Sequence, residues 1–369
     1  MQDGKKIGVG IIGYEVGRSW AALAHVPALK GLSDRFEIAA VSTTRQESAA
    51  AAAADIGIER GYSNAEQLIR CPEVDLVAVT VKVPHHHELV KAATAAGKHV
   101  YCEWPLGNGL REAEEMAAMV RAAGVHGIVG LQARCAPVIA YVRSLIASGH
   151  IGEVLSTTMV GSGLQWADWV DPPNVYLLDK RNGATLLSIP LGHAVDALCH
   201  CLGEFASLSS ITAIRQPKTI RLDTRQPVEK TAEDQVVVSG ILESGAVASI
   251  HYRAGQSRGV NFLWEINGSQ GDLQITATGG HAQMFELQLS GGQGKERSLS
   301  PMTVPPEFRW IPPAITGFGV NVAQMYARVA DDLRCGTTTA PGFDDAVIRH
   351  RLLAAIEEAA ATGRRVSLK

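Results

Sequence analysis

The first third of the chain alternates short apolar runs with helix-forming segments. The apolar runs are rich in β-branched side chains and lie at residues 7–12, 36–42, 74–81, 99–102 and 125–131. Runs of this kind are typical of strands that are buried on both faces of a parallel sheet. The segments between them are rich in Ala, Glu and Leu and lie at residues 45–57, 64–70, 85–97 and 110–124. This alternation predicts a doubly wound α/β sheet.

The pattern changes near residue 150, where strand-like runs begin to follow one another. They lie at residues 153–163, 207–216, 234–255, 261–280 and 284–292. The turn signals ESGA and GSQGD separate paired runs, which predicts antiparallel hairpins. Helical segments at 191–203 and 343–363 accompany them. We therefore expect an α/β domain over residues 1–132 and an α+β domain over residues 133–369 with a large, open, mostly antiparallel sheet.

Composition excludes several classes of protein. The chain has 369 residues, a formal net charge of -3 and no long run of Lys or Arg, so direct nucleic-acid binding is not expected. We find no basic-then-apolar leader and no apolar run of the length that spans a membrane. The six cysteines are widely spaced without a CxxC pair, which indicates reduced thiols and a cytoplasmic location.

The first apolar run ends in GIIGYEVGRSW, which has the character of a dinucleotide-binding turn. Such a turn needs glycine because the backbone must approach a pyrophosphate at the start of a helix, and Gly13 and Gly17 suit that role. The pattern departs from GxGxxG at Glu15, where glycine would be expected. Because the motif follows the first strand of an alternating series, we expect a nicotinamide dinucleotide here, with Tyr14 and Val16 also in the loop.

The second apolar run ends in VSTTRQE. An NAD-selective site usually has an acidic residue here for the ribose hydroxyls. This chain has Ser42, Thr43 and Arg45 instead, and hydroxyls with a guanidinium suit a 2′-phosphate. The sequence therefore favours NADP and leaves NAD open. The alternative is that Arg45 is a solvated side chain in the first turn of a helix.

In the second domain, GHAVDALCHCLG places His193, Asp196 and His200 on one helix face. A carboxylate one turn before a histidine orients the imidazole for proton transfer. The alternative is a set of packed or capping polar side chains. We do not expect a metal site among these residues, because Cys199 and Cys201 lie on other faces of the helix. The histidine run at residues 85–87 does not predict a metal site either. Substrate is expected between the two domains.

Several stretches together resemble one family across nearly the whole chain. They are VGIIG, HVPAL, AAGKHVYCEWPL, IGEV, GHAVDALCHCLG, INGSQGDL and AAIEEAAATGRRVSL. The resemblance is to the glucose-fructose oxidoreductase / inositol dehydrogenase / MocA family of NAD(P)-dependent oxidoreductases. It implies an N-terminal Rossmann domain, a C-terminal open-sheet domain, sugar or polyol substrates, and homodimers or homotetramers built on the open sheet. The family's DxxxH pair maps onto Asp196 and His200, which implies a catalytic or substrate-binding role for His200.

The triplet Glu103-Trp104-Pro105 departs from this family. Its enzymes typically have Glu-Lys-Pro at this strand end, with the lysine near nicotinamide and substrate, and an indole has no titratable proton to replace an ammonium. A narrower resemblance is to the galactose-regulon repressor branch, through VTVKVPHHHELV, YCEWPLGNGLREAEEM and GILESGAV. In that branch the lysine is likewise absent and the dinucleotide acts as a ligand of a transcriptional regulator.

Two functions are therefore expected as alternatives. The first is hydride transfer between nicotinamide and a sugar-like carbon, with His200 as acid/base, Asp196 as its orienter and Lys82 as a cation. The second is a non-catalytic NAD(P)-binding sensor or regulator. The remaining expected cofactor-binding residues are Val83, Pro84, His87, Glu103, Trp104 and Gln132. The expected substrate-binding residues are Trp104, Trp166, Asp168, His193 and His200.

Overall fold

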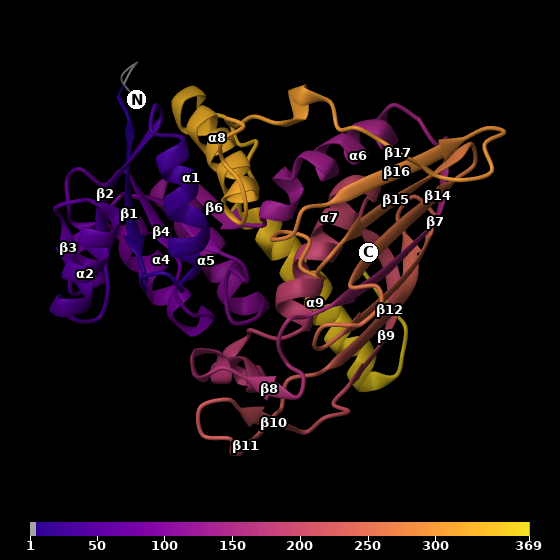
Figure 1. The fold of residues 1–369 in the computed structure, drawn as a ribbon, viewed down its shortest axis with the longest axis horizontal. Coiled ribbons are helices and arrows are strands. Elements are labelled where there is room, and N and C mark those ends of the chain that lie inside the picture. Colours follow the sequence, from indigo (N-terminus) through magenta and orange to yellow (C-terminus); the bar gives the residue numbers. More distant parts are fainter. Residues whose placement is uncertain (1–4, 369) are drawn as a thin grey trace. The chain divides into compact units, whose positions relative to one another are not determined.

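The computed structural model describes residues 5–368, which group into two units (Figure 1). The first unit contains the chain up to Cys135 together with Trp310–Ile348, and the second contains Ala136–Arg309 and the chain from Arg349 onward. This grouping differs from the expected division at residues 132/133, because Trp310–Ile348 packs with the first unit. One helix, α9 (Phe343–Thr362), has residues in both units.

The first unit is built on a parallel sheet with the strand order β3-β2-β1-β4-β5-β6. Its strands are β1 Ile7–Ile12, β2 Phe36–Ser42, β3 Gly61–Tyr62, β4 Leu76–Val79, β5 His99–Glu103 and β6 Gly127–Gly130. The order reverses beside β1, and ligands of such sheets bind at the carboxyl ends of the strands near this point. The predicted doubly wound α/β fold is confirmed.

Helices flank this sheet. They are the π-helical turn η1 Ala21–His25, α1 Val26–Gly31, α2 Gln46–Ile56, α3 Ala65–Ile69, η2 Val83–His85, α4 His86–Ala95, α5 Leu110–Ala123, η3 Gln132–Cys135 and α8 Gly319–Cys335. The Ala-rich helix α2 ends at Gly57 in the left-handed conformation, as a glycine C-cap requires. Helix α8 comes from the distant segment of the unit and packs against η1, α1 and η3.

The second unit is built on a nine-stranded sheet with the order β17-β16-β15-β14-β7-β13-β12-β9-β18. Its strands are β7 Val154–Ser162, β9 Phe205–Ala213, β12 Gln235–Leu242, β13 Val247–Arg253, β14 Phe262–Gly268, β15 Gly271–Ala277, β16 Gln288–Gln293, β17 Ser300–Pro301 and β18 Val366–Ser367. All neighbouring pairs are antiparallel except β13 with β7. The expectation of a large, mostly antiparallel sheet is confirmed.

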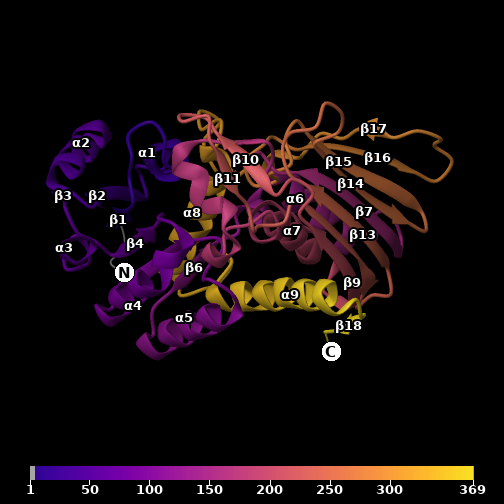
Figure 2. The ribbon, with the colours of Figure 1, turned by 90° about the horizontal axis from the view of Figure 1, so that it is seen from below.

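Helices of the second unit cover one side of this sheet, as Figures 1 and 2 show for α6, α7 and the later part of α9. Besides α9, the helical segments of the second unit are α6 Pro137–Ala147, η4 Pro172–Leu178, η5 Lys180–Asn182, the π-helical turn η6 Leu187–Leu191, α7 Gly192–Leu202 and η7 Pro306–Phe308. Strand β13 shows the resulting alternation, since Ile250 and Tyr252 are buried while Val247 is exposed. A separate small sheet joins β8 Trp169–Val170, β10 Lys218–Arg221 and β11 Pro227–Glu229.

One helical stretch, Lys180–Leu202, is long and apolar enough to cross a membrane by length and composition. Its apolar window is 83% buried inside the protein, as in the core helix of a soluble fold. This is weak evidence for a membrane span.

Candidate functional site

The turn after β1 requires glycine at one position for two reasons. Gly13 has a φ of 97°, and a Cβ added there would lie 2.6 Å from Val81 Cγ1. The Thr80 hydroxyl donates to the Gly13 carbonyl at 2.9 Å, so the turn is bonded to the end of β4. Gly17 also has a positive φ, 67°, but nothing lies within 4 Å of an added Cβ. The backbone is thus open to close approach at Gly17 and tightly packed at Gly13.

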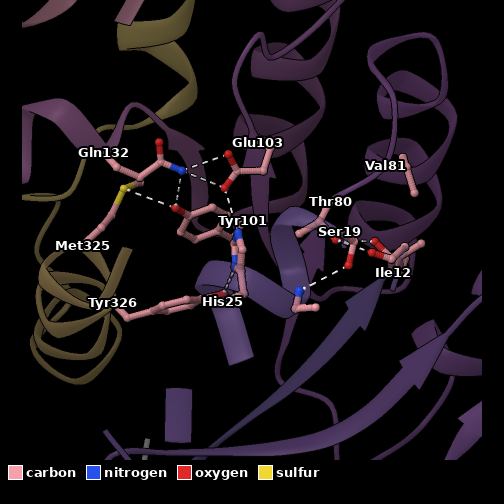
Figure 3. A network of polar contacts seen from close by, with 12 residues as sticks. Ile12, Ser19, His25, Thr80, Val81, Tyr101, Glu103, Gln132, Met325 and Tyr326 are labelled. Carbon is pink, nitrogen blue, oxygen red and sulfur yellow. Dashed lines mark hydrogen bonds and ion pairs between the residues drawn. The ribbon is translucent and has the colours of Figure 1, made fainter. Parts of the chain in front are cut away.

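The helix that follows is capped by a serine. Ser19 Oγ accepts from the backbone N–H of Glu15 at 3.0 Å and of Ala22 at 3.2 Å (Figure 3). Glu15 stands where the glycine pattern is broken, and its side chain pairs with Arg18 at 3.7 Å. Val16 is 47% exposed in the same turn. The loop therefore keeps an exposed backbone despite the acidic substitution.

Tyr14 lies beneath this loop. Its ring is buried and its hydroxyl donates to Asp55. Burial, with this hydrogen bond and the negative charge of Asp55, raises the pKa of the Tyr14 phenol well above its usual value. The Tyr14 side chain therefore serves the packing of the loop.

The end of β2 carries the residues predicted to select the cofactor. Ser42 is buried, and the Thr43 hydroxyl donates to the Arg45 carbonyl at 3.0 Å. The Arg45 side chain is exposed and forms no ion pair with any acidic residue between positions 5 and 368. Its guanidinium is therefore available to an anionic ligand.

A buried network holds the Glu103 carboxylate at the end of β5 (Figure 3). Glu103 Oε1 is 2.8 Å from His25 Nε2 and accepts from Gln132 Nε2 at 2.8 Å, while Oε2 accepts from the same amide at 2.8 Å. His25 Nδ1 lies 2.8 Å from the Tyr326 hydroxyl. Because a carboxylate only accepts, a neutral His25 carries its proton on Nε2 and Tyr326 donates to Nδ1. The tautomer of His25 follows from this network.

The same network fixes the Gln132 amide. Its Nε2 faces both Glu103 oxygens, so Oε1 points away from the carboxylate, and this buried Oε1 has no hydrogen-bond partner among the described residues. Gln132 Nε2 also lies 3.4 Å from the Tyr101 hydroxyl, which donates to Met325 Sδ at 3.4 Å. We call Glu103, His25, Gln132 and Tyr326 the Glu103 clamp. The Glu103 side chain is 14% exposed, so the clamp does not bury it completely.

The structure brings together the predicted residues Glu103 and Gln132 and adds partners that sequence reasoning missed. His25 lies in the HVPAL motif and ends a π-helical turn, a rare element that often marks functional sites. Tyr326 follows Glu103 by more than two hundred residues, and no local pattern connects the two. Only the packing of α8 reveals its role.

The Trp104-Pro105 peptide bond is cis, and the Trp104 side chain is 5% exposed. His86, another residue missed from sequence, connects this turn to the end of β4. Its Nδ1 lies 3.0 Å from the Pro105 carbonyl, and its Nε2 lies 3.0 Å from the Val81 carbonyl. Burial lowers the pKa of His86, although these carbonyls act in the opposite direction. A neutral imidazole has one N–H, so His86 donates to only one of these two carbonyls while its ring lies between the two loops.

The residues after β4 have different surroundings. Lys82 and Pro84 are exposed, whereas Val83 is buried. His87 Nε2 lies 2.9 Å from Glu115 on α5. The imidazole predicted to bind cofactor is therefore engaged with a neighbouring helix.

In the second unit, α7 carries the predicted proton-transfer residues. Asp196 is fully buried and accepts from Arg349 Nε at 3.1 Å, and Arg349 also binds Glu204 at 2.8 Å. The sequence predicted that Asp196 orients His200 and did not predict its contact with Arg349. The positive charge of Arg349 compensates the buried Asp196 carboxylate. His200 is half-buried, on the same helix.

His193 is the second residue of α7, which directly follows the π-helical turn η6 that contains Pro190. The side chain is 3% exposed, and burial lowers its pKa to about 3 against the opposing charge of Asp196. His193 is therefore neutral near pH 7 and suits hydrogen bonding to a neutral group.

The predicted sugar-stacking role does not fit Trp166. Its ring is 1% exposed, its indole N–H donates to the Leu177 carbonyl at 2.9 Å, and its own carbonyl accepts from buried Lys230. Trp166 has a φ of 66° and belongs to the core of the second unit. Asp168 is exposed, and the neighbouring Trp169 is 42% exposed. Within residues 5–368 no cluster of three or more His, Cys, Asp or Glu is arranged to hold a metal ion.

Comparisons with known proteins identify the family. Residues 7–131 match the model described as the oxidoreductase family with an NAD-binding Rossmann fold, and residues 137–277 match the model of the Gal80p C-terminal domain. The chain is 31% identical over 383 residues to dehydrogenase aclE of Aspergillus oryzae, covering 99% of each protein. The chain belongs to the Gfo/Idh/MocA family. Its first unit is the family's nicotinamide-binding Rossmann domain.

Relatives in this family include both regulators and enzymes. The chain is 29% identical over 306 residues to the galactose/lactose metabolism regulatory protein GAL80 of Kluyveromyces lactis. The matched region covers 77% of this chain and 67% of GAL80. Among solved structures, levoglucosan dehydrogenase in complex with NADH has the same fold, with a TM-score of 0.85, 23% identity, and coverage of 99% of this chain and 100% of that one.

Proposed function

We propose that the protein is a nicotinamide-dependent oxidoreductase that acts on a hydroxyl-bearing carbon of a sugar, polyol or related compound. The observation that carries the proposal is the Glu103 clamp, a buried network that holds a carboxylate at the carboxyl edge of a Rossmann sheet. Burying a carboxylate costs free energy unless hydrogen bonds compensate it, and buried titratable groups with specific partners are candidates for functional sites. The full-length match to dehydrogenase aclE supports it.

The residues at this edge fit a dinucleotide. Gly13 allows the tight turn, Gly17 leaves the backbone open to a pyrophosphate, and the helix start behind Ser19 favours negative charge. Thr43 and Arg45 would lie toward a ribose phosphate, which favours NADP over NAD. The Glu103 carboxylate, on a side chain that is 14% exposed, would accept a hydrogen bond from the nicotinamide half of the cofactor. The bound nicotinamide would supply or accept a hydride.

Oxidation of an alcohol also releases a proton from its hydroxyl. We assign this proton to the half-buried His200, with Lys82 as a cation that would polarise the hydroxyl. Asp196 accepts a hydrogen bond from Arg349 and is kept as the proposed orienter of His200. Trp104 cannot take part in proton transfer. Trp166 is left out of the substrate site because its indole N–H is used by the Leu177 carbonyl inside the core of the second unit, whereas His193 and Asp168 are kept as proposed substrate residues.

A second candidate is a non-catalytic sensor of NAD(P) that regulates another protein. Trp104 favours it, because the central position of the Glu-x-Pro triplet lacks an ammonium group. The GAL80 relative, a regulatory protein, also favours it. In this case the cofactor would be a ligand that is never turned over.

The two candidates differ in a direct assay. Purified protein with NADP or NAD is screened against aldoses, ketoses and polyols, among them levoglucosan and myo-inositol, the compounds named for two relatives. The enzyme proposal expects an absorbance change at about 340 nm that is lost in His200→Ala. Cofactor binding by calorimetry without any turnover would instead support the sensor.

The preference for NADP is tested separately. Arg45→Ala should weaken NADP binding by about tenfold or more, because a charge-assisted contact to the 2′-phosphate is lost. NAD binding should change little. The binding of both cofactors is measured by calorimetry, with Arg18→Ala as a control at another exposed arginine of the same domain. An equal loss for both cofactors in Arg45→Ala would reject the assignment.

We also propose that the open sheet forms a homodimer or homotetramer in the cytoplasm. Its outer side exposes apolar residues, with Ile211 66% and Val247 53% exposed. Exposed apolar side chains on one sheet are a common feature of subunit interfaces. None of the six cysteines, all of which lie in the described part of the chain, forms a disulfide, and this supports a reducing compartment. Light scattering of wild type and Ile211→Glu measures the oligomer, and an unchanged mass in the variant would contradict this interface.

A further inference from the structure

The glycine loop after β1 departs from the usual dinucleotide pattern at one position. Glu15 stands where the middle glycine of GxGxxG would let the backbone approach a ligand freely. Residues 15–18 are all exposed, and we call them the exposed turn. Because the middle glycine is absent, the placement of the exposed turn depends on the contacts of the residues on either side of it.

The exposed turn is closed by Ser19. The Ser19 hydroxyl accepts from the backbone N–H of Glu15 at 3.0 Å (Figure 3). The backbone N–H groups of Arg18 and Ser19 donate to the Glu15 carbonyl at 3.2 and 3.1 Å. These contacts set the shape of the turn. They join neighbouring residues, so they do not fix the turn to the rest of the first unit.

Tyr14 connects the start of the exposed turn to a neighbouring helix. The residue before it, Gly13, is held at the end of β4, since the Thr80 hydroxyl lies 2.9 Å from the Gly13 carbonyl oxygen. The Tyr14 ring is 8% exposed and belongs to the same hydrophobic core as the buried residues of α2. Its hydroxyl donates to the Asp55 carboxylate of α2. Tyr14 therefore ties the start of the exposed turn to α2.

Asp55 is not explained by the stability of α2. It is the next-to-last residue of that helix, where the partial negative charge of the helix C-terminus disfavours a carboxylate. The last turn of α2 contains no basic residue that could compensate it. Its carboxylate accepts the hydrogen bond from Tyr14 instead. The contact therefore serves the loop.

We propose that Tyr14 and Asp55 are positioning residues that hold the exposed turn ready for the pyrophosphate of the dinucleotide. The inference deepens the proposed function and rests on it for the ligand. The backbone at Gly17 is open to close approach, and a turn that is already ordered loses less conformational entropy when it binds. The Tyr14 ring is buried and its hydroxyl faces Asp55, so the pair acts through the backbone of the turn. Its effect should be specific to ligands that contain a pyrophosphate.

The test compares two ligands that share the adenosine 2′-phosphate, only one of which has a pyrophosphate. Calorimetry with the full-length protein measures the Kd of NADP and, by displacement, that of adenosine 2′-monophosphate. Tyr14→Phe removes only the hydroxyl. It should weaken NADP binding by about five- to tenfold, the order of one hydrogen bond, and leave the Kd of adenosine 2′-monophosphate unchanged. NAD and adenosine make the same comparison without the 2′-phosphate.

Asp55 supplies the matched variants. Asp55→Asn keeps an acceptor oxygen for the phenol and should bind NADP nearly as wild type does, whereas Asp55→Leu should lose as much affinity as Tyr14→Phe. The double variant with Tyr14→Phe and Asp55→Leu should lose no more than either single change, because both remove one hydrogen bond. Asp55 is exposed, so its variants decide the question if Tyr14→Phe does not fold. Tyr62→Phe, at a half-buried phenol of β3, is the control and should leave NADP binding unchanged.

Failure of this inference is distinguishable from failure of the proposed function. Unchanged dinucleotide binding in Tyr14→Phe and Asp55→Leu, or an equal loss for both ligands, overturns the positioning role even if the protein turns over a sugar. A lower thermal midpoint without a selective loss of the dinucleotide assigns the pair to packing and also overturns it. A selective loss supports the role even if no turnover is found. Binding of neither NADP nor NAD to wild type overturns both the role and the proposed function.

Discussion

At the residue scale, Gly13 and Gly17 show that two glycines of one loop have different requirements. Gly13→Ala adds a methyl 2.6 Å from Val81 Cγ1 at a positive φ, whereas Gly17→Ala meets nothing within 4 Å. We expect Gly13→Ala to cost roughly 2 kcal/mol or more in free energy of unfolding and Gly17→Ala about 1 kcal/mol. Urea denaturation measures both, and an equal cost would contradict the role of the Val81 contact.

The Glu103 clamp makes a second prediction at this scale. Tyr326→Phe removes the hydroxyl that lies 2.8 Å from His25 Nδ1 and leaves a buried acceptor unsatisfied. It should lower the free energy of unfolding by about 1–3 kcal/mol and weaken NADH binding. Tyr101→Phe is the matched control, because its hydroxyl makes only 3.4 Å contacts with Gln132 and Met325. A larger effect in Tyr101→Phe than in Tyr326→Phe would show that the clamp has been assigned to the wrong phenol. Urea denaturation measures the free energy of unfolding, and calorimetry measures NADH binding.

Single residues also show where sequence reasoning stopped. Glu103 and Gln132 were named as cofactor-binding residues, and the structure places them in hydrogen-bond contact. His25 and His86 lie in motifs that were noticed, yet their partners are distant strands and helices. An imidazole looks the same in a sequence whether it binds a ligand or a loop carbonyl, so burial and contacts are needed to separate the two.

At the scale of elements, Arg349 anchors α9 to α7 inside the second unit. It is fully buried between Asp196 and Glu204. Arg349→Met removes the guanidinium that pairs with Asp196, and breaking a buried ion pair typically costs about 3–5 kcal/mol. Arg351→Met, an exposed arginine two residues later, should cost about 0.5 kcal/mol or less. Equal unfolding midpoints for the two variants in urea would contradict the anchoring role.

Most strands and helices were predicted correctly from local sequence patterns. The strands at 7–12 and 36–42 and the helix at 110–123 were expected within a residue or two of their observed ends, because apolar runs and glycine C-caps act locally. Helix α8 was not expected. The two π-helical turns were also missed, since their extra residue has no sequence signature.

At the scale of the whole molecule, buried histidines predict acid sensitivity of the second unit. Burial lowers the pKa of His193 to about 3 and those of His281 and His350 to about 4, against 6.5 in the unfolded chain. The unfolded state therefore binds more protons below pH 6.5, and stability falls as the pH drops from about 6.5 toward 4. Each histidine contributes up to about 1.4 kcal/mol per pH unit in that range.

The thermal unfolding midpoint at pH 7 and pH 5 measures this effect. The wild type should have a lower midpoint at pH 5 than at pH 7. His350→Phe should reduce this difference in midpoint by about the contribution of one histidine. The same change at the half-buried His150, in the loop between α6 and β7, is the control variant. Equal midpoints at the two pH values would contradict the buried neutral histidines.

The sequence by itself determined the α/β sheet, the open antiparallel sheet, the glycine turn and the unusual Glu-Trp-Pro triplet. Each depends on neighbouring residues, through strand and helix periodicity and the steric freedom of glycine. Only the tertiary structure decided that Trp310–Ile348 joins the first unit, that Tyr326 completes the Glu103 clamp and that Arg349 compensates Asp196. These pairings depend on which distant side chains share a buried environment, and burial is a property of the folded chain.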